Sequence, residues 1–139
     1  MDKTLRLLIL EDSPSDAELM VFELKEAGIT FTSKRVMTEE AFIRELKEFS
    51  PDLILSDYDL PQYTGALALA EARSRLPEVP FILVTGAVGE DRAIEILTQG
   101  AKDYVLKNRL HRLVPAVRRA LAEVEEQKAC KKAEGIENN

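Results

Sequence analysis

The sequence is poor in cysteine, in basic residues and in long apolar runs. Cys130 is its single cysteine, which excludes an intramolecular disulfide and a cysteine-rich zinc site and agrees with a reducing compartment. The first apolar run covers only six residues, 5–10, whereas a membrane span needs roughly 20. Lys and Arg number 19 against 25 Asp and Glu, and the resulting net charge of −6 repels nucleic-acid phosphates. We therefore expect a cytoplasmic protein with no membrane segment and no direct nucleic-acid contact.

The length and composition of the chain predict one globular domain. The chain has 139 residues, of which 45% are hydrophobic and 32% charged, an ordinary balance for a folded domain. No internal repeat is visible. The apolar stripe of the last predicted helix fades after Val124, so we divide the chain into a domain at 4–124 and a charged, frayed tail or truncated linker at 125–139.

Five short apolar runs alternate with helical patterns. Strands are predicted near 5–10, 30–36, 52–57, 79–84 and 102–106, and helices near 13–27, 38–49, 65–76, 90–99 and from about 113 onward. The segments 58–64 and 85–89 are predicted as loops. Strict alternation of strand and helix indicates a parallel sheet with helices on both faces. The expected fold class is therefore α/β, a doubly wound five-stranded parallel sheet in the order 2-1-3-4-5 with five flanking helices.

Polar residues follow four of these strands where each strand ends. Glu11 and Asp12 follow the first strand, Asp57 ends the third, Thr85 follows the fourth and Lys107 follows the fifth. Ligands of open parallel sheets bind outside the carboxyl ends of the strands. An isolated aspartate there is usually a turn former or helix cap, but the whole set at one edge indicates a functional site.

This set of side chains suits phosphoryl chemistry. Carboxylates that gather in one place repel one another, and a hard divalent cation such as Mg²⁺ relieves that repulsion. A carboxylate can also attack phosphorus, and phosphoryl transfer is catalysed mainly by positioning and charge neutralisation. We therefore predict Asp57 as the phosphoryl acceptor, with Glu11 and Asp12 holding the metal. Lys107 and Thr85 would each contact a phosphoryl oxygen.

The sequence closely resembles the receiver domains of two-component response regulators. The matching segments are LILED at 8–12, ILSDYDLP at 54–61 with Gly65, VTG at 84–86 and GAKDYVLK at 100–107, in an order and spacing that hold over residues 5–122. The resemblance implies a phosphohistidine donor on a sensor histidine kinase or a histidine phosphotransfer protein. It also implies dependence on Mg²⁺ or Mn²⁺, with the backbone carbonyl of Asp59 as a further metal ligand.

A conformational switch is implied by the same resemblance. Thr85 would move toward the phosphoryl group while Tyr104 turns inward, and the output face would comprise the helix at 90–99, the strand at 102–106 and the last helix. A strand tyrosine is equally often a packing residue, so both roles stay open for Tyr104. Residues that would touch the kinase are Ser13, Pro14, Asn108, Arg109 and Leu110. Asn108 stands where the family usually has proline, and a cis bond before a non-proline residue costs about 2.5–4 kcal/mol, so we expect a trans Lys107–Asn108 bond.

Two other functional classes compete with this interpretation. One is an unphosphorylated interaction module that kept only the fold. The other is a haloacid-dehalogenase-type phosphatase, suggested by Asp57 and Asp59, although that pair normally follows the first strand. We expect a signalling domain rather than a turnover enzyme, acting on a downstream protein target or a missing output domain. The expected oligomeric state is a monomer or a weak dimer.

Overall fold

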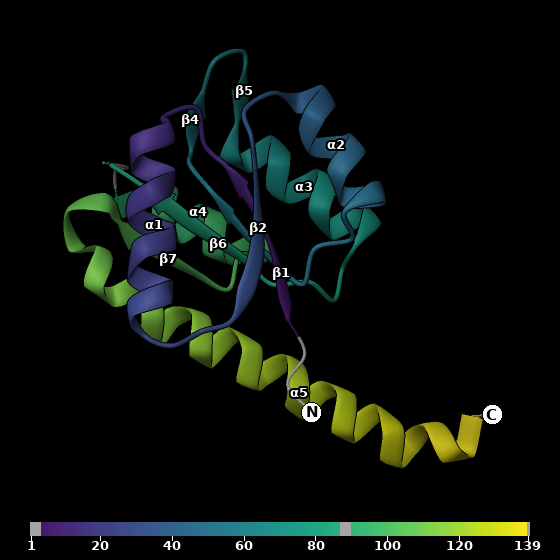
Figure 1. The fold of residues 1–139 in the computed structure, drawn as a ribbon. Coiled ribbons are helices and arrows are strands. Elements are labelled where there is room, and N and C mark those ends of the chain that lie inside the picture. Colours follow the sequence, from purple (N-terminus) through teal and green to yellow (C-terminus); the bar gives the residue numbers. More distant parts are fainter. Residues whose placement is uncertain (1–3, 87–89, 139) are drawn as a thin grey trace.

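The computed structural model of the protein describes residues 4–86 and 90–138 (Figure 1). Five parallel strands form the main sheet in the order β2-β1-β3-β6-β7, which confirms the doubly wound order predicted from the sequence. The order reverses beside β1, because the chain first adds β2 on one side and then β3, β6 and β7 on the other. The strands are β1 (Leu5–Leu10), β2 (Phe31–Val36), β3 (Leu53–Ser56), β6 (Phe81–Thr85) and β7 (Asp103–Leu106).

Helices connect the strands and begin at recognisable caps. The side chains of Ser13, Thr38 and Thr64 each accept a hydrogen bond from a backbone amide three residues later. Such caps each contribute about 1 kcal/mol and fix where a helix starts. The helices are α1 (Pro14–Glu26), α2 (Glu39–Glu48), α3 (Gly65–Arg75), α4 (Glu90–Thr98) and α5 (Leu113–Asn138).

The core consists of two apolar layers, one on each face of the sheet. Alternate residues of a strand point to opposite faces, so Leu8 and Leu10 pack with α2, α3 and α4, whereas Leu7 and Ile9 pack with α1 and α5. Figure 1 shows α1 on one side of the sheet and α2 and α3 on the other. Both faces are therefore covered, which explains why the central strands are continuously apolar.

The strand register brings the ends of the central strands to one level. Leu10 pairs with Ser56, Ser56 pairs with Leu83, and Thr85 pairs with Leu106. The residues that follow β1, β3 and β7 therefore emerge at the same edge. This edge contains the point at which the strand order reverses, where ligands of such sheets bind.

Two segments differ locally from the sequence-based expectation. The predicted loop 58–64 contains a small antiparallel hairpin of β4 (Asp59–Leu60) and β5 (Tyr63–Thr64), which turns at Gln62 with a φ of 60°. Strands this short carry no periodicity that a sequence could show. A 3₁₀ helix spans Lys107–Arg112 between β7 and α5, and the Lys107–Asn108 bond is trans, as is every other peptide bond in the described part.

The C-terminal segment continues α5. Residues 125–138, which we predicted as a charged and frayed tail or linker, are helical, and the end of α5 projects beyond the rest of the domain in Figure 1. No helix in the described part of the chain combines the length and the apolar character that a bilayer crossing requires. The predicted exit loop 85–89 lies partly outside the described residues, because 87–89 are not among them.

Candidate functional site

Glu11 and Asp57 are fixed by backbone hydrogen bonds that continue the sheet past the ends of its strands. The Glu11 amide donates to the Val36 carbonyl at 2.9 Å, and the Asp57 amide donates to the Leu10 carbonyl at 2.9 Å. Glu11 is fully buried and Asp57 is 7% exposed. Ionised carboxylates at this depth need charged partners or hydrogen bonds, and the sheet edge provides both.

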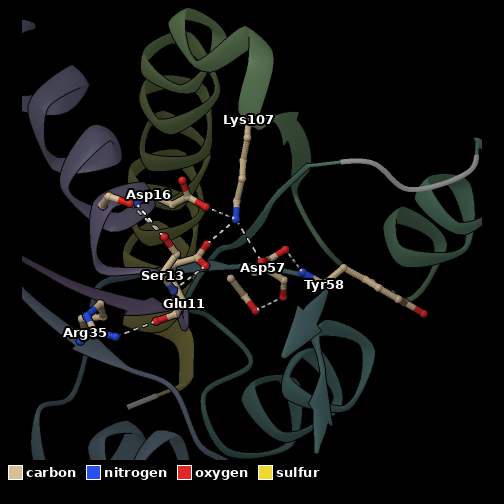
Figure 2. A network of polar contacts seen from close by, with 9 residues as sticks. Glu11, Ser13, Asp16, Arg35, Asp57, Tyr58 and Lys107 are labelled. Carbon is tan, nitrogen blue, oxygen red and sulfur yellow. Dashed lines mark hydrogen bonds and ion pairs between the residues drawn. The ribbon is translucent and has the colours of Figure 1, made fainter. Parts of the chain in front are cut away.

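Lys107 supplies the balancing charge. Its Nζ atom lies 2.8 Å from Glu11 Oε1, 2.8 Å from Asp16 Oδ2 and 3.0 Å from Asp57 Oδ2 (Figure 2). Partial burial acts against the charged form of Lys107, but the close contacts with Asp16, Glu11 and Asp57 outweigh it and raise the pKa of the ammonium group. The lysine therefore stays charged at neutral pH and is oriented toward the Asp57 carboxylate.

The Asp57 carboxylate is oriented by two contacts on different oxygens. Oδ1 accepts a hydrogen bond from the Tyr58 amide at 2.7 Å, and Oδ2 faces Lys107. Gly65 permits the backbone to pass close by, because a Cβ atom there would lie 2.7 Å from the Asp57 carbonyl oxygen. The Gly65 amide also donates to the Tyr58 carbonyl at 2.7 Å. The start of α3 therefore holds the loop that presents Asp57.

A metal site is suggested by the oxygen atoms of Glu11, Asp12 and Asp57. One carboxylate oxygen from each lies within 4.8 Å of the other two. Burial raises the pKa of Glu11, and its buried Oε1 accepts no well-directed hydrogen bond from any described residue despite the nearby Lys107 ammonium. An all-oxygen set of this kind matches the ligands that Mg²⁺ prefers. The residues therefore fit the divalent ion that the sequence predicted.

The remaining predicted site residues lie around this group. Thr85 is the last residue of β6 and is 2% exposed, while Asp59 is exposed at the first position of β4. Tyr104 lies on β7 and is 37% exposed, so its side chain points outward in this structure. Neither Thr85 nor Tyr104 has a described contact with Asp57, and the structure leaves their switch role a prediction.

The predicted kinase-contact residues lie on two segments at this edge. Ser13 caps α1 through its side chain, and Pro14 is the first residue of that helix. Asn108 and Arg109 are exposed in the 3₁₀ helix, whereas Leu110 is partly buried against the core. The segments are neighbours because α1 contacts the 3₁₀ helix.

Asp16 is the site residue that sequence reasoning missed. It lies in the first turn of α1, where acidic residues are common because they interact favourably with the helix dipole. Its contact partner Lys107 is 91 residues away in the chain, and no local pattern predicts that pairing. The separation between the two residues explains why only the folded structure identified Asp16.

The fold and the site together define a class of protein. The chain is a flavodoxin-like α/β domain that gathers carboxylates and one lysine at the switch point of its sheet. The chain belongs to the response regulator receiver domain family, whose sequence model matches residues 7–118. It is thus a receiver domain of the kind used in two-component signalling.

Individual relatives support this assignment. The chain is 32% identical over 102 residues to the response regulator protein FleR of Pseudomonas aeruginosa, and 35% identical over 99 residues to the regulatory protein LuxO of Vibrio vulnificus. These matches cover 73% and 71% of this chain but 21% of each relative, so the chain spans about a fifth of their length.

Solved structures show the same fold. The signal receiver domain of a LuxO repressor protein from Vibrio parahaemolyticus aligns with a TM-score of 0.83 and 25% identity, over 93% of this chain and 98% of that one. A CheY-like receiver domain protein from Methanospirillum hungatei aligns with a TM-score of 0.79 and 23% identity, over 90% and 99% of the two chains.

Proposed function

We propose that this receiver domain takes a phosphoryl group onto Asp57 from a phosphohistidine of a sensor kinase or phosphotransfer protein. The observation that supports this proposal most directly is the contact between Lys107 and the buried Asp57 carboxylate. Lys107 Nζ lies 3.0 Å from Asp57 Oδ2 at the switch point of the sheet. A carboxylate oxygen of Asp57 forms a bond to phosphorus while the bond from phosphorus to the imidazole nitrogen of the donor breaks. No oxidant, reductant or further reactant is needed.

The residues around Asp57 have separate roles in this proposal. Glu11, Asp12, Asp57 and the Asp59 carbonyl would hold Mg²⁺ or Mn²⁺, which when bound neutralises phosphoryl oxygens. Lys107 donates to another phosphoryl oxygen and is already charged and oriented. Thr85 is the remaining donor, at the end of β6. In this proposal the domain is a signalling module that works in the cytoplasm, and it is not a turnover enzyme.

The output of the domain would be a change in the surface formed by α4, β7 and α5. Tyr104 supports this proposal, because it lies exposed on β7 beside the strand that ends in Thr85. An inward rotation of Tyr104 would remove an aromatic ring from that surface. The docking partner would be a downstream protein or an output domain, and sedimentation with and without phosphoryl donor distinguishes a monomer from a weak dimer.

Intact mass after incubation with Mg²⁺ and acetyl phosphate tests the proposal. Wild type should gain about 80 Da, the mass of one phosphoryl group, and Asp57→Asn should gain nothing. Asp52→Asn is the matched control, because Asp52 lies just before β3, at the opposite end from Asp57, where its carboxylate accepts from the Arg6 amide. That control should gain the same mass as wild type.

Three results would contradict the proposal. A gain that survives in Asp57→Asn would place the acceptor elsewhere. A gain that survives chelation of the metal would remove the metal from the mechanism. No gain in wild type would favour a module that kept the fold alone.

A further inference from the structure

Among the described carboxylates in contact with Lys107, Asp16 alone lies outside the metal group formed by Glu11, Asp12 and Asp57. Its Oδ2 is 2.8 Å from Lys107 Nζ (Figure 2). The backbone of Asp16 is held in the cap of α1, because its amide donates a hydrogen bond to Ser13 Oγ at 3.3 Å. Asp16 is therefore a fixed anionic group on the helix side of the site.

Lys107 and a divalent cation would use the same carboxylates. Glu11 and Asp57 belong to the metal group and also contact the lysine ammonium. An ammonium group has three donor hydrogens and here meets three carboxylates. Metal binding at Glu11 and Asp57 would draw both carboxylates toward the cation and weaken their contacts with Lys107, whereas the contact to Asp16 would not be affected in this way.

We propose that Asp16 is a positioning residue that retains the Lys107 ammonium when Mg²⁺ occupies the Glu11, Asp12 and Asp57 carboxylates. This inference rests on the proposed function, because it assumes that those carboxylates bind the metal. Without Asp16, Lys107 has only Glu11 and Asp57 as counter-ions and competes more strongly with Mg²⁺. Removing the Asp16 charge also makes the site less attractive to a cation. Both effects act in one direction, toward weaker metal binding.

Titration of the protein with Mg²⁺ alone, followed through the backbone amide signals of Glu11 and Asp57, tests this role without any phosphoryl donor. Asp16→Asn should raise the Kd about tenfold, the lower end of the effect of residues that support metal ligands. Glu18→Gln is the matched control, because it removes one negative charge from the exposed side of the same helix. It should change the Kd by less than about twofold, since exposed charges are screened by solvent and salt.

A double-mutant cycle separates action through Lys107 from simple charge attraction. Lys107→Met alone should tighten Mg²⁺ binding, because it removes the competing cation. If Asp16 acts mainly through the lysine, Asp16→Asn should change the Kd clearly less in the Lys107→Met background than in wild type, and the change that remains measures the direct charge attraction. Urea unfolding of each variant verifies that the domain remains folded.

Two outcomes would overturn the inference. One is an Asp16→Asn variant with the Kd of wild type, and the other is an effect of the same size with and without Lys107. Both are distinct from failure of the proposed function, which the mass experiment on Asp57 tests independently. A wild-type protein that gains the phosphoryl group while Asp16→Asn binds Mg²⁺ normally would refute the role of Asp16 and leave the acceptor intact.

Discussion

Gly65→Ala offers a direct test of how the start of α3 supports the acceptor. A Cβ atom at this position would lie 2.7 Å from the Asp57 carbonyl oxygen, 3.0 Å from Tyr58 Cα and 3.0 Å from a methyl group of Leu83. Two of these three atoms belong to the backbone, so no side-chain rotation can relieve the contact. Overpacking of this kind costs about 1–3 kcal/mol.

The net effect is smaller than the clash, because alanine restricts the unfolded chain. Restricting the unfolded chain stabilises the folded state by about 0.4–1 kcal/mol. The net decrease in the free energy of unfolding is therefore about 1–2 kcal/mol. For a domain of this size the melting temperature should fall by about 3–8 °C. Gly86→Ala is the control, because a Cβ atom there meets no described atom within 4 Å. It should be neutral or slightly stabilising.

Urea unfolding followed by circular dichroism measures both variants, and the mass gain with acetyl phosphate reports on Asp57. We expect Gly65→Ala to lose stability and to take up the phosphoryl group more slowly than Gly86→Ala, because the backbone must shift at Asp57. Equal unfolding midpoints for the two variants would refute the steric argument.

Three further predictions follow from the contacts and the pKa shifts. Glu45→Gln should destabilise the domain at pH 7 but not near pH 3. The hydrogen bond from Lys34 lowers the pKa of Glu45 against the opposing effect of burial. The ionised Glu45 therefore stabilises the fold above the unfolded pKa near 4.5, and this contribution is lost as the pH falls through the lower folded pKa. Equal melting-temperature losses at both pH values would contradict it. Burial raises the pKa of Glu11, so protonation favours the metal-free fold at low pH, while Mg²⁺ needs the ionised form. The rise in melting temperature with Mg²⁺ should therefore grow as the pH increases above the ordinary glutamate value of 4.5, and a pH-independent rise would exclude Glu11 as a ligand. Ser13→Ala removes the cap of α1 and should lower the free energy of unfolding by about 1 kcal/mol in urea titrations, whereas an unchanged midpoint would show that the cap is dispensable.

The alternation of strands and helices and the polar residues at the strand ends followed from the sequence, whereas periodicity alone could not fix the strand order. The central strands β3 and β6 are short apolar runs buried along their whole length, and a parallel sheet forces the carboxyl ends of its strands to one edge. The sequence therefore predicts that Glu11, Asp12, Asp57 and Lys107 lie at one edge, and the structure brings them together there. That part of the prediction depended only on the period of hydrophobicity and on topology.

The tertiary structure decided the features that depend on how separate elements pack. Asp16 meets Lys107 because α1 lies against the 3₁₀ helix that follows β7. The hairpin of β4 and β5 and the exposure of Tyr104 likewise became visible only in the structure, because neither leaves a periodic pattern in the sequence. Hydrophobic periodicity determines which face of an element is buried. The meeting of two polar side chains across elements depends on ångström-scale packing, which no local sequence pattern encodes.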